Sequence, residues 1–83
     1  MKTAIREILS KHGRLPVAID TLGDEADLHA AGLTSFGSVE VMMALEEEFG
    51  IEFPDRMLNR RNFASVAAIE TAVKMVQTEA AAA

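Results

Sequence analysis

The stretch GLTSFGSVEVMMALEEEF, residues 32–49, decides the fold of this chain. Thr34 and Ser35 are of the residue types that cap a helix by accepting a backbone N–H bond, and an apolar and acidic run follows them. Gly50 and Pro54 end that run, because glycine favours helix termination and proline cannot continue a helix. The stretch therefore predicts a helix from about Ser35 to Phe49, with Ser35 at its mouth.

The predicted helix carries two apolar stripes when its side chains are placed about 100° apart. The stripe that suffices to face a core consists of Val41, Met42, Leu45 and Phe49. The opposite stripe consists of Phe36, Val39 and Met43, with Glu40 and Glu47 along it. An apolar patch with a rim of carboxylates has the layout of a docking surface. In an alternative arrangement, Phe36 folds back under the preceding loop and Met43 meets another helix.

Before this helix, apolar residues at helical spacing predict a first helix over residues 3–12, which Gly13 ends. Residues 14–34 contain proline and glycine among scattered leucines, so they are expected to form a long loop that the leucines pin to the core. Long ordered loops in small domains usually serve a function. The loop that leads to Ser35 is therefore expected to serve a function.

After this helix, residues 56–61 are expected to form a short third helix, and Ser65 is placed to cap a fourth. The apolar positions of that last helix are Val66, Ile69, Val73 and Val76. Residues 79–83 have no periodic apolar contacts to make and are expected to fray. No strand-like alternation, internal repeat or second domain is present, so residues 1–83 are expected to form one all-α domain.

The charge distribution narrows the possible partners. The formal net charge is −5, and residues 15–55 hold ten carboxylates and no lysine or arginine. Such a surface repels nucleic acid and anionic lipid and attracts basic protein surfaces, although a charge run can also be a solvated face that serves solubility. No apolar run approaches the roughly 20 residues that span a bilayer, and no signal core opens the chain. We expect a cytoplasmic monomer with no nucleic-acid or membrane partner.

Catalysis and metal binding find little support in the sequence. The chain has no cysteine, and its two histidines, His12 and His29, are too scattered to suggest a zinc site. A serine nucleophile needs a base and an orienting acid. The residues around Ser35 also lack the second glycine of a Gly-x-Ser-x-Gly elbow. We expect no enzymatic activity and no metal ion, and we expect His29 to be a surface residue of the loop.

Taken together, Asp27-Leu28, Gly32, Ser35, the run from Val39 to Phe49, Ile51 and Phe53-Pro54-Asp55 resemble the acyl carrier protein family over nearly the full chain. The resemblance implies a four-helix bundle with a long loop between helices one and two and a short helix three. It also implies that a phosphopantetheinyl transferase attaches 4′-phosphopantetheine to Ser35. The thiol of that arm would then hold an acyl group as a thioester for partner enzymes.

This chain departs from fatty-acid carriers, which typically read Asp-Ser-Leu where it reads Thr34-Ser35-Phe36 and which have an acidic third helix where it has Arg60 and Arg61. Together with the stretch from Asn59 to Phe63, these residues resemble the small stand-alone aminoacyl carrier proteins of bacteria. That resemblance implies a small amino acid as cargo and an amino acid:[carrier protein] ligase as the loading enzyme. A downstream acyl acceptor or modifying enzyme would then receive the cargo.

We therefore predict a carrier that docks its partners through a face around Ser35. This face consists of Thr34, Phe36, Val39, Glu40, Met43, Glu47, Arg60 and Arg61. Two alternatives remain at this point. The first is a fatty acyl or polyketide carrier, which would need a cavity deep enough for a long chain. The second is an acidic interaction module in which Ser35 is never modified.

Overall fold

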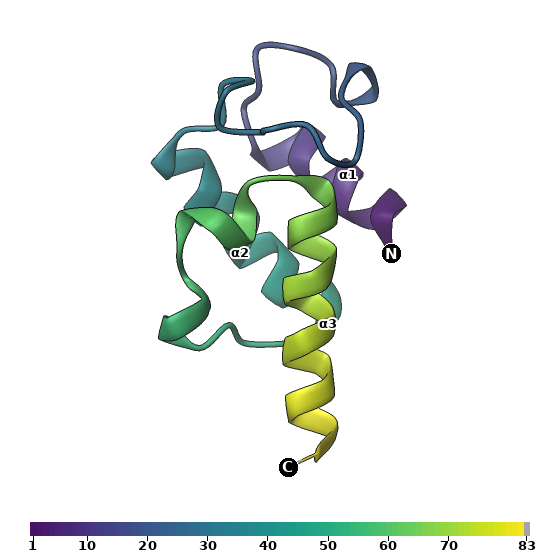
Figure 1. Ribbon diagram of the computed structural model, residues 1–83, viewed down its shortest axis with the longest axis vertical. Coiled ribbons are helices and arrows are strands. Elements are labelled where there is room, and N and C mark those ends of the chain that lie inside the picture. The colour runs from purple at the N-terminus through teal and green to yellow at the C-terminus, as the bar shows by residue number, and fades with distance from the viewer. Residues whose placement is uncertain (83) are drawn as a thin grey trace.

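A computed structural model describes residues 1–82 of the chain, and side chains of residues 1–79. Its three α-helices are α1 (Lys2–His12), α2 (Ser35–Phe49) and α3 (Val66–Ala82) (Figure 1). Its three 3-10 helices are η1 (Ile19–Thr21), η2 (Asp55–Met57) and η3 (Arg60–Phe63). Residues 1–82 contain no strand, so the predicted all-helical class is confirmed.

The short third helix expected over residues 56–61 is not an α-helix. The chain forms the two 3-10 turns η2 and η3 there, and extended Asn59 separates them (φ −133°, ψ 161°). The side-chain oxygen of Asn59 accepts a hydrogen bond from the backbone N–H of Asn62 at 3.0 Å, so it begins a new turn instead of continuing the previous one. The structure thus has three α-helices, and a count of four is not confirmed.

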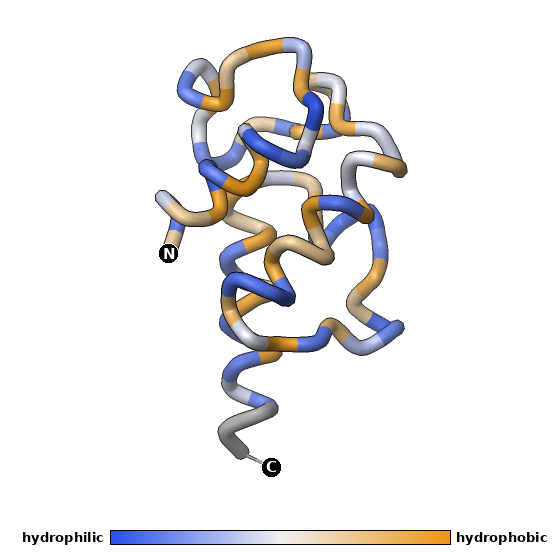
Figure 2. Tube along the Cα trace, turned by 180° about the vertical axis from the view of Figure 1, so that it is seen from behind, coloured by the Kyte–Doolittle hydropathy of each residue, from blue (hydrophilic) through white to orange (hydrophobic). Residues whose placement is uncertain are grey.

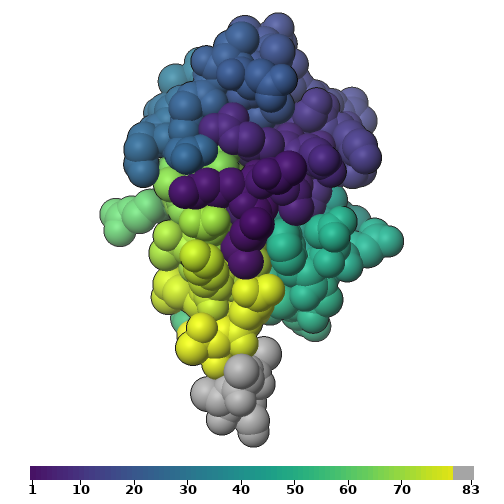
Figure 3. Space-filling model, turned by 90° about the vertical axis from the view of Figure 1, so that its right-hand side faces the viewer, coloured from purple at the N-terminus to yellow at the C-terminus, as the bar shows by residue number. Residues whose placement is uncertain are grey.

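The core lies where α1 packs against both α2 and α3. Its fully buried side chains are Ile5, Leu9, Leu28, Val41, Leu45, Val66, Ile69 and Val73. Apolar and polar residues alternate along the helices (Figure 2), which gives each helix a side that can be buried. The space-filling view shows α1 between α3 and the second half of α2 (Figure 3). One cluster of hydrophobic side chains therefore holds the described part of the chain together.

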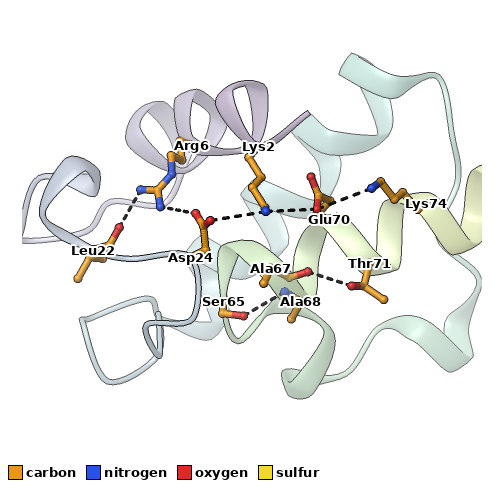
Figure 4. Close-up of polar contacts among 10 residues, drawn as sticks. All are labelled: Lys2, Arg6, Leu22, Asp24, Ser65, Ala67, Ala68, Glu70, Thr71 and Lys74. Carbon is orange, nitrogen blue, oxygen red and sulfur yellow. Dashed lines mark hydrogen bonds and ion pairs between the residues drawn. The ribbon is translucent and has the colours of Figure 1, made fainter.

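The long loop over residues 14–34 is tied to α1 and, through Lys2, to α3 (Figure 4). Arg6 of α1 donates hydrogen bonds to the carbonyl oxygens of Ile19 and Leu22 and to the carboxylate of Asp24, at 3.1, 2.8 and 2.6 Å. Lys2 lies between Asp24 and Glu70 of α3, at 3.6 and 3.7 Å. Since Leu28 and Leu33 of the loop are also buried, the expected anchoring by leucines is confirmed.

The predicted helix caps are present. The Thr34 hydroxyl oxygen accepts the Gly37 N–H at 3.0 Å at the start of α2, and Gly50 ends α2 in the left-handed conformation (φ 60°). The Ser65 oxygen accepts the Ala68 N–H at 3.0 Å at the start of α3. Fraying is expected from the sequence for residues 79–83, but α3 continues to Ala82 and Glu79 forms an ion pair with Arg56, whereas Ala83 lies outside the described residues.

Among residues 1–82, no helix combines the length and the apolar character that crossing a membrane requires. The same residues contain no group of three histidine or carboxylate side chains that could hold a metal ion.

Candidate functional site

Ser35 is the first residue of α2, and its side chain is exposed. The neighbouring Thr34 supplies the helix cap, so the Ser35 hydroxyl is left out of the capping interaction. The N-terminus of a helix carries unpaired N–H groups and the positive end of the helix dipole. A negatively charged group attached at Ser35 would therefore be stabilised by the helix that follows it.

The arrangement around Ser35 does not support nucleophilic catalysis. His29, one of two possible bases, directs its ring nitrogens towards the carbonyl oxygens of Leu33 and Arg60, at 3.4 and 3.0 Å. His12 is exposed at the end of α1, where it lines a groove on the other side of α2. A serine without a base and an orienting acid is a weak nucleophile. The geometry fits an attachment point better than a catalytic serine.

A groove of about 500 Å³ runs beside Ser35, between the start of α2 and the η2–η3 segment. We call it the serine groove. The residues that line it include Ser35, Ser38, Met42, Leu58 and Arg60. Within the described residues, the Ser38 hydroxyl oxygen is the one buried side-chain polar atom with no hydrogen-bond partner. Such atoms are rare in folded proteins and call for an explanation.

The outer stripe of α2 forms a ridge next to this groove. The side chains of Phe36, Val39 and Met43 are 76%, 53% and 59% exposed, whereas Val41 and Leu45 are fully buried. Met42 and Phe49 of the inner stripe are half-buried and pack against the core, so the predicted inner and outer stripes are confirmed although only part of the inner one is fully buried. Phe36 does not fold back under the long loop. Exposed apolar side chains that lie together in this way are typical of a surface that contacts another protein.

A second and larger groove, about 890 Å³, lies on the other side of the ridge, between α1 and α2. Glu40 and Glu47 reach it from α2, and Lys11 and Arg14 from the end of α1 and the residues after it. Arg14 forms an ion pair with Glu40 at 3.2 Å. The acidic rim expected from the sequence is thus partly neutralised at Glu40, whereas Glu47 is exposed and has no ion pair in the described part of the chain.

The arginine pair of η3 is exposed, as its predicted docking role requires. Arg60 lines the serine groove and Arg61 does not. The nearby Arg56 is paired with Glu79 of α3. Neither Arg60 nor Arg61 has an ion pair among residues 1–79, so both are available to an external anion, and Arg60 is the one that shares the serine groove with Ser35.

His29 lies half-buried in the loop, and it makes a structural contact that the sequence did not predict. Its ring links the long loop to η3 through the carbonyl oxygen of Arg60. The two residues are 31 positions apart, and no local pattern marks the contact. The link fixes one wall of the serine groove relative to the other.

The described residues fit a phosphopantetheine arm. Ser35 offers an exposed hydroxyl, the serine groove begins beside it, and Ser38, which lines that groove, has a buried hydroxyl oxygen with no hydrogen-bond partner. The arm supplies the thiol on which an acyl group is carried. This chain has no cysteine of its own to do so.

Comparisons with known proteins show the family to which this chain belongs. Residues 3–73 match the family described as "phosphopantetheine attachment site". An aminoacyl carrier protein of Agrobacterium fabrum is 59% identical over 76 residues, which cover 92% of each chain.

Solved structures give the same result. A carrier protein from Agrobacterium tumefaciens, crystallised with an engineered Bradyrhizobium japonicum glycine:[carrier protein] ligase and AMP, is 61% identical with a TM-score of 0.87, covering 89% of this chain and 99% of that one. A solution structure of an A. tumefaciens protein is 57% identical with a TM-score of 0.80 over the full length of both chains. Sequence and structure thus make this chain a member of the phosphopantetheine-bearing carrier proteins, which serve partner enzymes as substrates and are not enzymes themselves.

Proposed function

We propose that Ser35 is the residue that carries phosphopantetheine. The observation that carries this proposal is the exposed Ser35 hydroxyl at the N-terminus of α2, left free because Thr34 caps the helix. In the transfer, the Ser35 oxygen attacks the phosphorus of coenzyme A that bears the pantetheine. The Oγ–P bond forms, the P–O bond to 3′,5′-ADP breaks, and the hydroxyl proton passes to a base of the transferase. The helix dipole favours the resulting phosphodiester charge.

We further propose that the cargo is a small amino acid such as glycine, loaded by an amino acid:[carrier protein] ligase. Support comes from the relative named an aminoacyl carrier protein and from the similar carrier seen with a glycine:[carrier protein] ligase. The two grooves described above are both open at the surface, and the core between the helices is filled by side chains. A small cargo needs no deep cavity, whereas a long acyl chain would.

The docking face proposed for these partners is the ridge of α2 together with its two flanks. It comprises Thr34, Phe36, Val39, Glu40, Met43, Glu47, Arg60 and Arg61. The η2–η3 segment takes the place that a short third helix would have in a four-helix carrier. The exposed apolar ridge would supply the contact area, and the charges on each side would supply orientation.

Intact mass after incubation with coenzyme A and a broad-specificity phosphopantetheinyl transferase tests the attachment. We expect wild-type protein to gain the mass of one arm and Ser35→Ala to gain none. Ser38→Ala, one turn further along the same face of α2, is the matched control and should gain the arm like wild type. A gain that persists in Ser35→Ala would reject this attachment site, and no gain in wild type would favour an unmodified interaction module.

Loading of the modified protein tests the cargo. A glycine:[carrier protein] ligase with ATP and glycine should add the mass of one glycyl group, and hydroxylamine should release it because a thioester is cleaved by this nucleophile. Loading of a fatty acyl group by a fatty-acid loading enzyme, with no loading by the ligase, would favour the fatty acyl alternative.

A further inference from the structure

The serine groove has the chemistry of a resting place for the arm. Resting on the proposed attachment at Ser35, we propose that Arg60 pairs with the phosphodiester and that Ser38 hydrogen-bonds the pantetheine part inside the groove. Ser35, Ser38 and Arg60 all line this one groove. Its volume of about 500 Å³ falls in the range of small-molecule sites, roughly 300–1,000 Å³.

Arg60 provides a positive charge that can pair with the negative charge of a phosphodiester at Ser35. It is exposed and free of ion pairs among the residues whose side chains are described, and the only other charged or titratable residue that lines the groove is His29. Arginine presents a planar group of donors that matches two phosphate oxygens. The phosphodiester at Ser35 would thus lie between the N-terminus of α2 and the guanidinium of Arg60.

Ser38 provides a hydrogen bond that the protein itself leaves unused. Its hydroxyl oxygen is buried and has no partner, although the residue lines the groove. A serine hydroxyl can both donate to a carbonyl oxygen and accept from an N–H. Pantetheine carries two amides, and either could satisfy this hydroxyl and remove the cost of leaving it unpaired, once rotation about χ1 turns the oxygen from its buried position towards the groove.

The remaining walls suit the apolar part of the arm. Val39 and Leu58, which are 53% and 44% exposed, lie on the rim, and Met42 lies deeper. Pantetheine has a pair of methyl groups close to its phosphate, and these side chains can cover them. The contact between the His29 ring and the Arg60 carbonyl oxygen joins the residues before Ser35 to η3. It therefore holds the η3 wall of the groove in position relative to α2.

The test compares apo and modified protein by NMR. Intact mass first establishes that each sample carries the arm, so failure of attachment is seen separately from failure of docking. In modified wild type we expect nuclear Overhauser effects between the arm methyl groups and the side chains of Met42 and Leu58, and a shift of the Ser38 amide signal relative to apo protein.

Arg60→Gln is the variant and Arg61→Gln its matched control, because both remove one exposed positive charge and only Arg60 lines the groove. Arg60→Gln should lower the ratio of docked to free arm roughly two- to fivefold, the range set by an exposed ion pair. Arg61→Gln should leave the ratio as in wild type. Equal losses in both variants would overturn the role of Arg60.

Ser38→Ala tests the contact of the arm with Ser38 without an expected loss of protein stability. Since it removes a hydroxyl with no partner in the protein, the apo variant should be at least as stable as apo wild type. After modification, its contacts between arm and groove should weaken. Modified wild type that shows no such contacts, with Ser38 signals identical to those of apo protein, would overturn the proposal while leaving attachment at Ser35 intact.

Discussion

Arg14 donates two hydrogen bonds to the carboxylate of Glu40, from Nε to Oε2 and from Nη2 to Oε1, each 3.2 Å long. Arg14 is the residue that ends the basic N-terminal segment, and it adopts a left-handed conformation (φ 54°) as the chain leaves α1. The pair places a cation on the acidic flank of α2. Glu40 and Glu47, which are equivalent in the sequence pattern, therefore differ in charge environment.

Charge reversal at Glu47 should slow association with a basic partner enzyme. Glu47 has no ion pair in the described part of the chain, so Glu47→Lys changes the field that an approaching partner meets without breaking an internal contact. We expect a severalfold lower association rate at low salt and a smaller difference near 150 mM salt, because exposed charges are screened over about 8 Å there. Stopped-flow measurements with the loading ligase would test this.

Glu40→Gln is the comparison for this prediction. Glu40→Gln breaks the ion pair with Arg14 and changes the net charge by one unit. Because Glu47→Lys changes the net charge by two units, Glu40→Gln should change the association rate less. Association rates that do not respond to Glu47→Lys at any salt concentration would place the contact surface elsewhere.

Val41→Ala should act on stability and not on docking. Val41 is fully buried in the core-facing stripe of α2, and its truncation should lower the free energy of unfolding by about 1–3 kcal/mol through lost burial and a residual cavity. Val39→Ala is the matched control, since the same residue type on the same helix is 53% exposed there and should change stability by less than about 0.5 kcal/mol. Urea denaturation of both variants distinguishes them. Similar losses at the two positions would contradict the assignment of the stripes.

Asp24 should make stability depend on pH. The hydrogen bond from Arg6 lowers the pKa of the Asp24 carboxyl, the charge of Lys2 acts in the same direction, and partial desolvation opposes both. Because the folded pKa is the lower one, the stabilisation is fully present above the unfolded value of about 4 and is lost as pH falls through the folded pKa.

Asp24→Asn should therefore be less stable than wild type at pH 7, and the difference should shrink as the pH falls below about 4. Denaturation curves at several pH values measure this difference. Asp20→Asn serves as control, since Asp20 is exposed and has no ion pair among the described side chains. A gap between wild type and Asp24→Asn that stays constant with pH would show that the Arg6 contact is not electrostatic.

The structural features that could be predicted are those that depend on residues close together in the sequence. The bounds and stripes of α2 follow from periodicity and capping residues that lie within a few positions of one another. The division of the 56–61 segment into η2 and η3 was less accessible, because it depends on one extended residue, Asn59, whose side chain begins the second turn.

The unpredicted contacts are those that close the long loop. Arg14 meets Glu40 across 26 positions, and His29 meets Arg60 across 31. Neither contact has a periodic or spacing signal, since each depends on where the loop returns to the helices. Both lie on the flanks of the proposed docking face. Sequence patterns therefore indicated Ser35 and the apolar ridge but not the charge balance around them.

Gly37→Ala should destabilise the fold although alanine favours helices by about 1 kcal/mol over glycine. Gly37 is buried in the first turn of α2, and a Cβ there would lie 2.8 Å from the carbonyl oxygen of Gly13 and 3.2 Å from Leu33 Cδ1. The oxygen belongs to the backbone at the end of α1 and cannot rotate away, so α1 and α2 must separate. Overpacking of this kind costs about 1–3 kcal/mol, which exceeds the gain in helix propensity.

Gly23→Ala is the control for this prediction, because nothing lies within 4 Å of a Cβ at that position. Denaturant unfolding of the two variants should show a loss for Gly37→Ala and little change for Gly23→Ala. A shift in the backbone signals of Gly13 and Arg14 in Gly37→Ala would identify the separation of the helices as the cause. Equal or greater stability of Gly37→Ala would mean that the close approach of α1 to α2 does not require glycine.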